Sequence, residues 1–395
     1  MKYLLIGAYC MICILTACNH SNINTVNVDE NGVIKLKIDP MSFHDDLFSD
    51  LIEDVYFIQL ETSTESRLGE IGKIEIKGDK IFIQDRSLHE IKIFNIDGKY
   101  LGKISNRHRG PGGYNDIYSF SVSKNGELIE IYDSRGFKFR TYNLNNEFVE
   151  DFSIDYIVSD FMKLENDKKV VYSGYFPSYN MDGFPNSSRL LFVNKSDVYQ
   201  SAFDYVYSES NRIREVMGGF RNLSYYGDTI VLGAEYADFN IYHIFEDSIK
   251  KKYQIDFGDE FMPPININSS EEEIENFLNL DQRHEFAKIF RVLESSQHLF
   301  VEYAVKKRMC FFLLDKTNGE VYNLQSSFDP SRRVDISVPV TIWNDTFVGI
   351  LNAEYFKMVF ESRKEQGIDP PSILSEIDRK IDENCNPVLS FIKFK

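Results

Sequence analysis

The sequence has few cysteines for its length, with five in 395 residues. Cys10, Cys13 and Cys18 lie near the N-terminus, which leaves Cys310 and Cys385 in the rest of the chain. A disulfide-rich scaffold is therefore excluded. Because the last two cysteines lie far apart in the sequence, we expect two inert buried thiols, with a single bridge as the alternative.

Positive charge is also scarce. Lys and Arg total 44 against 61 Asp and Glu, which gives a formal net charge of −17. Nucleic-acid binding needs a basic footprint that neutralises phosphates, so we exclude nucleic acid as a partner. The excess of acids favours solubility of the folded domain.

Motifs that carry familiar chemistry are missing as well. The chain contains no Gly-x-Ser-x-Gly elbow and no phosphate-binding loop. Its seven His residues show no paired metal-binding spacing, so the sequence predicts no metal site and no cofactor. The acids are too numerous for any one pair to indicate glycosidase or lyase chemistry.

No apolar run is long enough to cross a bilayer as a helix. The chain begins with one Lys, continues with an apolar run over 3–15, and reaches a Leu-Thr-Ala-Cys sequence that ends at Cys18. This arrangement is typical of a secretory signal. Its last four residues resemble the lipobox of bacterial lipoproteins, in which the peptide is cut before the Cys and the Cys is acylated.

The start of the chain is therefore expected to be processed. We predict a signal peptide over 1–17 and lipidation of Cys18, with an ordinary secretory signal as the alternative. The residues that follow are rich in Asn, Ser, Thr and Val without a period, so we predict a flexible tether over 18–40.

The sequence does contain a repeated motif, a turn followed by a strand of alternating apolar residues. Its copies begin at residues 78, 125, 166, 227, 296 and 344. Repeats of this size made of strands are typical of propeller blades, whose four strands we label A to D in chain order. The repeated motif corresponds to the A–B turn together with strand B. The sequence thus predicts an all-β fold over 41–395, a six-bladed β-propeller of four-stranded antiparallel blades.

The sixth blade is one strand short, because only 339–343, 344–351 and 387–394 remain for it. We expect 53–60 to supply its fourth strand, since this strand has no other partner and closure removes an open edge. Three segments break the strand pattern and are predicted to be helical insertions, at 269–286, 353–366 and 371–381.

The long connections all leave one face of the expected propeller. Every one of them is a B–C or D–A loop: 105–116, 174–187, 208–219, 258–288, 326–338 and 352–386. Loops carried on a rigid scaffold are where binding usually resides, so this long-loop face is the predicted binding face.

Several segments together resemble a known family. They are Asp85-Arg86, 93–99, the Gly-Pro-Gly loop from Arg109 to Tyr114, and 386–389. The chain resembles the six-bladed β-propeller lipoproteins of Bacteroidota, which are similar to NHL-repeat propellers. That family usually has Glu before the Tyr of the Gly-Pro-Gly loop, whereas this chain has Gly113, which removes a carboxylate.

The long-loop face also carries the candidate ligand-binding residues. A Gly-rich loop with two Arg and a His can hold a carboxylate, a sulfate or a uronic acid. The predicted ligand-binding residues are Arg86, Arg107, His108, Arg109, Tyr114 and Arg135. The alternative is a tight connection whose Arg side chains pair with neighbouring acids. For Asp85 and Asp133, repetition at equivalent strand ends favours a structural role, in which each accepts backbone N–H groups.

The residues near the rim of later blades are less informative. Tyr and Glu recur there and are compatible with sugar or peptide contact and equally with packing: Tyr175, Glu235, Tyr236, Glu302, Tyr303, Glu354 and Tyr355.

These observations favour a lipid-anchored, non-catalytic binding or scaffold protein of the cell envelope. We expect it at the outer membrane, on the periplasmic or outer side, with a glycan, a peptide or another envelope protein as partner. The alternative is a lyase or hydrolase that acts on a carbohydrate or peptide in the central funnel. An enzyme would bring two or more titratable groups within hydrogen-bond reach in that funnel.

Overall fold

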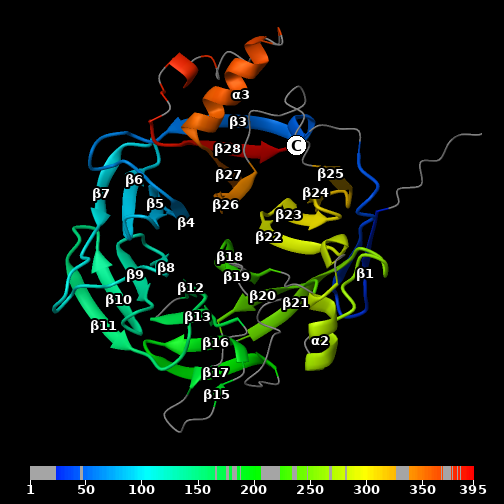
Figure 1. The fold of residues 1–395 in the computed structure, drawn as a ribbon, viewed down its shortest axis with the longest axis horizontal. Helices are drawn as coiled ribbons and strands as arrows, with labels where there is room; N and C mark the ends of the chain where they lie inside the picture. Colours follow the sequence, from blue (N-terminus) through cyan, green and yellow to red (C-terminus); the bar gives the residue numbers. More distant parts are fainter. Residues whose placement is uncertain are drawn as a thin grey trace, which may run out of the picture.

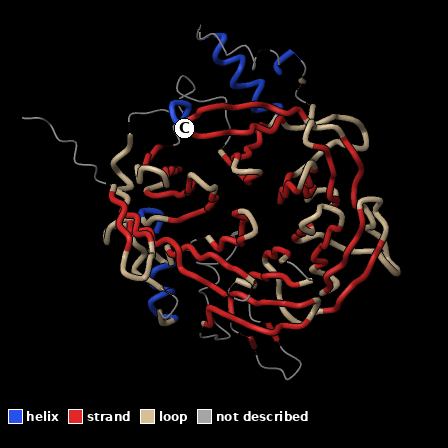
Figure 2. The backbone as a smooth tube through the Cα atoms, turned by 180° about the vertical axis from the view of Figure 1, so that it is seen from behind, coloured by secondary structure: helices blue, strands red, loops and turns tan. Residues whose placement is uncertain are grey.

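Six antiparallel sheets stand as blades around a common axis (Figure 1). The computed structural model describes residues 24–44, 48–164, 167–174, 178–179, 185–186, 188–205, 223–233, 238–246, 248–266, 269–280, 283–325, 338–365, 367, 375, 377–379, 381–382 and 384–395. Strand A of each blade lies nearest the axis, and strand D follows the circumference (Figure 2). The predicted six-bladed β-propeller is confirmed.

From the axis outward, blade 1 contains β4 (Ile71–Lys77), β5 (Lys80–Asp85), β6 (Glu90–Asn95) and β7 (Tyr100–Ile104). Blade 2 contains β8 (Ser119–Val122), β9 (Leu128–Asp133), β10 (Lys138–Asn143) and β11 (Phe148–Ser153). Blade 3 contains β12 (Asp160–Lys163), β13 (Lys168–Tyr172), β16 (Ser188–Asn194) and β17 (Asp197–Asp204), and the pair β14 (Ser178–Tyr179) and β15 (Pro185–Asn186) lies in its B–C loop.

Blade 4 contains β18 (Leu223–Tyr226), β19 (Thr229–Leu232), β20 (Asn240–Phe245) and β21 (Ser248–Asp256). Blade 5 contains β22 (Lys288–Glu294), β23 (His298–Val305), β24 (Arg308–Asp315) and β25 (Val321–Gln325). Blade 6 contains β26 (Pro339–Trp343), β27 (Thr346–Leu351), β28 (Val388–Phe394) and β3 (Ile52–Gln59).

The backbone conformation of the A–B turns explains the residues of the repeated motif. Gly78 and Gly126 in the A–B turns have φ of 59° and 72°, and Asp167 has φ of 61° at the corresponding turn of blade 3. Gly adopts this left-handed conformation without strain, and Asp or Asn tolerates it better than most residues. The strand that follows is covered by neighbouring blades, so its residues are buried almost continuously, as in β9.

The ring closes as predicted. β3 pairs antiparallel with β28, with Phe57 opposite Ser390. The buried Asn386 side chain then fixes the chain after β3, because its Nδ2 donates to the carbonyls of Glu61 (2.7 Å) and Ser66 (2.9 Å). Its Oδ1 accepts from the Leu68 N–H at 2.8 Å. Both ends of the propeller are therefore held at one joint.

The N-terminal segment differs from the predicted tether. Residues 25–37 form a hairpin of β1 (Thr25–Val28) and β2 (Ile34–Lys37), and β2 pairs in parallel with β21 on the outer edge of blade 4. Leu36 and Ile38 are buried in the core shared by blades 4 and 5. The tether prediction fails here because these apolar side chains have a sheet edge to cover.

The same segment continues across blade 5 before it enters blade 6. The buried Asn323 of β25 donates from its side-chain amide to the carbonyls of Asp39 and Ser42, each at 2.9 Å. The His44 N–H donates to the Asn323 carbonyl at 2.8 Å, and the short helix η1 (Phe48–Leu51) leads into β3. The described residues 24–44 and 48–59 thus run along the outer edges of blades 4, 5 and 6.

The described helices of 269–286 and 353–366 lie in predicted insertions, whereas η1 was not predicted. α2 (Glu271–Leu278) has a capping box in which Ser270 and Glu273 bond reciprocally, and η2 (Arg283–Glu285) follows it. α3 (Ala353–Glu365) lies outside blade 6 and packs through Phe356 and Phe360 (Figure 1). Most of 371–381 lies outside the described residues.

Other predictions can be placed briefly. Cys310 and Cys385 are both free thiols, as expected, but only Cys310 is buried and Cys385 is partly exposed. Cys18, Tyr175, Glu235 and Tyr236 lie outside the described residues. In the part of the chain that the structure describes, no helix has the length and apolar character needed to cross a membrane.

Candidate functional site

Two buried carboxylates organise the long-loop face of blades 1 and 2. Asp85, at the end of β5, accepts from the Gly69 N–H at 2.7 Å and the Leu88 N–H at 3.1 Å. Asp133, at the end of β9, accepts the N–H groups of Asp116 and Gly136 at 3.3 and 3.2 Å. Hydrogen bonds from several backbone donors stabilise a buried carboxylate. The predicted structural role of both residues is confirmed.

A third carboxylate joins the segments that carry the predicted ligand-binding residues. Asp116 contacts Nδ1 of His89 at 2.6 Å in the B–C turn of blade 1. It also accepts from the Ser134 hydroxyl at 3.1 Å in the B–C turn of blade 2. The structure therefore brings the turns 86–89 and 134–137 against the loop 105–116.

Tyr114 lies beneath this junction rather than on it. Its side chain is only 1% exposed, and its hydroxyl donates to the His89 carbonyl at 2.7 Å. Burial raises the pKa of Tyr114, so the hydroxyl stays neutral at ordinary pH. Tyr142 supports the same loop, because its hydroxyl donates to the Gly112 carbonyl at 2.9 Å. Tyr114 can thus affect a ligand only by positioning the loop.

The basic residues of the prediction lie outward. Arg107, His108, Arg109 and Arg135 are exposed. Within the described residues, the side chains of the three Arg make no hydrogen bond and no ion pair. Arg86 differs, because its Nη1 lies 3.4 Å from Oε1 of Glu70. The alternative in which neighbouring acids neutralise these arginines therefore has support only at Arg86, and ligand binding by the set stays a prediction.

Sequence reasoning missed three large apolar residues on this face. Leu88 is 49% exposed, Tyr118 47% and Phe137 52%. Phe137 has a φ of 48°, which is uncommon for a bulky side chain. The available signal was their position, since Leu88 and Phe137 lie in short turns where polar residues are usual. We call the following set the blade 1–2 surface: Arg86, Leu88, Arg107, His108, Arg109, Tyr118, Arg135 and Phe137.

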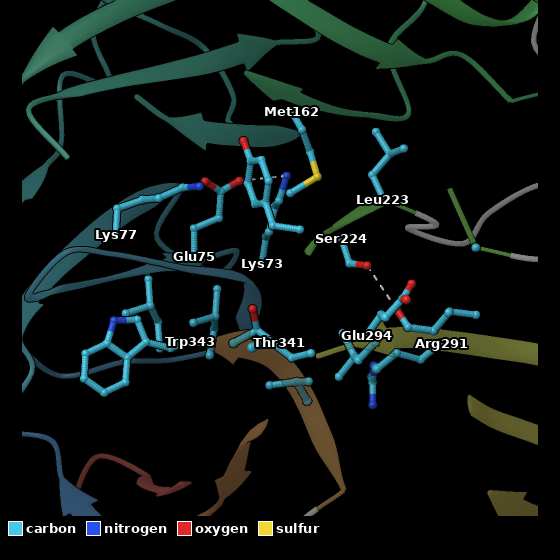
Figure 3. A pocket seen from close by; sticks show the side chains of 18 of the residues that line it. Lys73, Glu75, Lys77, Met162, Leu223, Ser224, Arg291, Glu294, Thr341 and Trp343 are labelled. Carbon is cyan, nitrogen blue, oxygen red and sulfur yellow. Dashed lines mark hydrogen bonds and ion pairs between the residues drawn. The ribbon is translucent and has the colours of Figure 1, made fainter. Parts of the chain in front are cut away.

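The second candidate region is the central channel, a cavity of about 810 Å³ lined by the A strands of the blades other than blade 2 (Figure 3). Among the charged residues that line this cavity, Lys73 of β4 makes contacts with two carboxylates. Its Nζ lies 3.1 Å from Oε1 of Glu75 and 3.0 Å from Oδ1 of Asp160, which belongs to β12 of blade 3. Blade 2 joins this cluster, because the Ser119 hydroxyl donates to Asp160 at 2.6 Å and the Val122 N–H to Glu75 at 2.9 Å.

This cluster meets the geometric criterion for an enzyme but not the requirement for access. Lys73, Glu75 and Asp160 are all buried, and the ammonium is fully engaged because it also donates to the Phe161 carbonyl at 2.9 Å. Buried charges that are held by ion pairs and hydrogen bonds are typical of a structural contact between blades. The arrangement links three blades and gives no support to acid–base catalysis.

No group of three His, Cys, Asp or Glu side chains among the described residues is placed to hold a metal ion.

Comparison with solved structures identifies relatives of the same fold. A Bacteroides fragilis protein described as exported is 19% identical with a TM-score of 0.72, over 92% of this chain and 99% of that chain. A member of the DUF4221 family from Bacteroides vulgatus is 13% identical with a TM-score of 0.50, over 87% of this chain and 97% of that chain. At these identities the likeness establishes the fold alone.

Sequence comparison gives one result at the family level. No curated protein matches the chain. Residues 33–393 match a family model that is described as a domain of unknown function, DUF4934. The matched range covers the propeller and begins just before β2.

Proposed function

The chain belongs to the DUF4934 family, and we propose that it is a lipid-anchored, non-catalytic binding protein of the cell envelope. In this proposal the blade 1–2 surface binds a partner that carries carboxylate or sulfate groups. Such a partner is a glycan, a peptide or another envelope protein.

Support for the envelope comes from the N-terminus. The apolar run over 3–15 and the Leu-Thr-Ala-Cys sequence at Cys18 have the form of a lipoprotein signal. The Bacteroides fragilis protein of similar fold is described as exported. Acylation at Cys18 would hold the propeller on a membrane surface, which we propose is the outer membrane.

The binding proposal rests on the exposure of three arginines and on their lack of ion pairs among the described residues. Arg107, Arg109 and Arg135 are exposed and have no ion pair among the described residues, in a chain of net charge −17. Arginine recognises carboxylate and sulfate groups through paired N–H donors. Leu88 and Phe137 add exposed apolar area beside these charges, and such patches commonly mark interaction sites.

The support beneath the surface suits recognition. Asp85, Asp116 and Asp133 fix the turns and the loop through hydrogen bonds to several segments. A ligand therefore meets a largely ordered backbone, and little conformational entropy is lost on binding.

An array of acidic and neutral glycans and acidic peptides tests the proposal with the purified protein. We expect binding to acidic members only, and a loss of about tenfold or more in the double variant R107A/R109A, since two charge-assisted contacts disappear. The matched control is K99A/K250A, which removes two exposed positive charges elsewhere. Equal binding by the wild type and R107A/R109A would reject the site.

A further inference from the structure

The central channel has a second feature at the end formed by the A–B turns, which is opposite to the blade 1–2 surface. Lys77 ends β4 there and lines the cavity together with Trp343 of blade 6 (Figure 3). Tyr225 lines the same cavity from blade 4. Trp343 is the single Trp of the chain. Its Nε1 donates to the Gly78 carbonyl at 2.9 Å, which fixes the indole beside the turn that follows Lys77.

Lys77 differs from the other basic residues of the channel. Five basic side chains line the cavity: Lys73, Lys77, Arg86, Lys124 and Arg291. Four of them have a carboxylate within 3.4 Å, at Asp160, Glu70, Asp228 and Glu302. Lys77 has no carboxylate within ion-pair distance in the described part of the chain.

The surroundings of Lys77 leave its charge poorly compensated. Its Nζ lies 3.3 Å from the centroid of the Tyr225 ring, a cation–π contact. Burial lowers the pKa of Lys77, and the negative charge of Glu75 opposes this effect. Glu75 is itself occupied, since it pairs with Lys73 and accepts the Val122 N–H. A partly desolvated ammonium of this kind favours an anionic ligand.

One carboxylate oxygen of the residues that line the channel has no donor in the described part of the chain. Oδ2 of Asp160 is buried and accepts no hydrogen bond from any described residue, whereas Oε1 of Glu75 lies 3.1 Å from Nζ of Lys73. Buried carboxylate oxygens normally have donors, from the protein, from bound water or from a ligand. Around the channel, Lys77 therefore lacks an anionic partner and Oδ2 of Asp160 lacks a donor among the residues described.

We propose that the channel binds an acidic sugar, a small saccharide with a carboxylate group that contacts Lys77. A sugar hydroxyl donates toward the buried Oδ2 of Asp160 through a bound water. The Trp343 and Tyr225 rings provide apolar walls for the sugar ring, and a cavity of about 810 Å³ has the size of a small-molecule site.

An exposed ion pair spans this end of the channel. Lys124 in the A–B turn of blade 2 reaches Asp228 in the A–B turn of blade 4, with Nζ 3.0 Å from Oδ2. Both side chains are largely exposed. An exposed ion pair contributes little to stability, so it can open when a ligand enters.

Tryptophan fluorescence provides a direct test, because Trp343 lines the channel. The purified protein is titrated near pH 7 with D-galacturonate and its disaccharide, and with D-galactose, up to about 20 mM, which covers weak affinities. We expect a saturable fluorescence change with the acidic sugars only. K77M should weaken binding about tenfold or more, since it removes the charged donor.

The control variants separate this site from the blade 1–2 surface. K80M removes a basic residue three positions away, which pairs with exposed Asp79, and should bind like the wild type. R107A/R109A should also leave the channel titration unchanged. Calorimetry on the same samples detects binding that does not alter the indole signal. No saturable binding by either method, or equal binding by K77M, would overturn the proposal.

Discussion

Buried charges between neighbouring blades differ in role from exposed charges on the blade 1–2 surface. Between blades 2 and 3, the buried Glu130 pairs with Lys163 at 2.8 Å and with the buried Lys169. On the blade 1–2 surface, Arg107 and Arg109 are exposed and have no described ion-pair partner. The first set is held by the protein and is costly to disturb. The second set contributes little to folding, which leaves it available for a ligand.

A buried joint residue should give the largest effect on stability. Replacing Glu130 with Ala leaves Lys163 and Lys169 without their carboxylate, and breaking a buried pair costs about 3–5 kcal/mol. We expect urea unfolding to show this loss in the free energy of unfolding. The control is E127A, at an exposed position just before β9. It should change the free energy of unfolding little.

The ring closure offers the next largest effect. Asn386→Ala removes three hydrogen bonds to the backbone of Glu61, Ser66 and Leu68. Buried groups left unpaired cost about 1–3 kcal/mol each, and partial access to water reduces the sum, so we expect a total of about 3 kcal/mol. N384A lies two positions away at an exposed site and serves as the control. A wild-type melting temperature for N386A would contradict the role of this joint.

The buried carboxylates also predict how stability depends on pH. Burial by itself raises the pKa of Glu130, but Lys169 and Lys163 outweigh it and hold the pKa below the ordinary value. A carboxyl with a lowered pKa in the folded state stabilises the protein above its unfolded pKa, and this contribution disappears as the pH falls through the folded pKa. The free energy of unfolding should therefore fall below about pH 5.

E130Q isolates this contribution, because it removes the titrating group at nearly constant size. We expect its stability to vary less than that of the wild type between neutral pH and about pH 4. E127Q should follow the wild-type curve. An equal slope for E130Q and the wild type would show that Glu130 does not carry the acid sensitivity.

The surface arginines should have the smallest effect on folding. Arg135→Ala removes an exposed side chain without a described ion pair, so the free energy of unfolding should change by less than about 0.5 kcal/mol. The same variant should bind acidic glycans less tightly than the wild type. A large loss of stability would mean that Arg135, like Glu130, stabilises the fold.

Much of the architecture can be predicted because it repeats. Gly or Asp residues recur in the A–B turns of five of the six blades, and the extra strand at 53–60 has one vacant edge to fill. The capping pattern at Ser270 and Glu273 is local and marks α2 directly. The structural role of Asp85 and Asp133 follows from their repetition at strand ends.

What could not be predicted depends on contacts between distant residues. The strand β2 is short, and its partner β21 lies more than two hundred residues later, so no local period marks it. The Lys73, Glu75 and Asp160 cluster joins blades 1 and 3 across the channel. Among the arginines, sequence could not tell that Arg86 has an acidic neighbour while Arg107 and Arg109 have none described.

The most direct test of this account measures affinity and stability on the same samples. Polygalacturonate at low salt is titrated into the wild type, R107A/R109A and K99A/K250A, and each protein is then unfolded with urea. The account predicts binding about tenfold weaker for R107A/R109A alone, with free energies of unfolding equal within about 0.5 kcal/mol. Unchanged affinity in R107A/R109A, or an equal loss in K99A/K250A, would contradict the claim that these exposed arginines form the binding site.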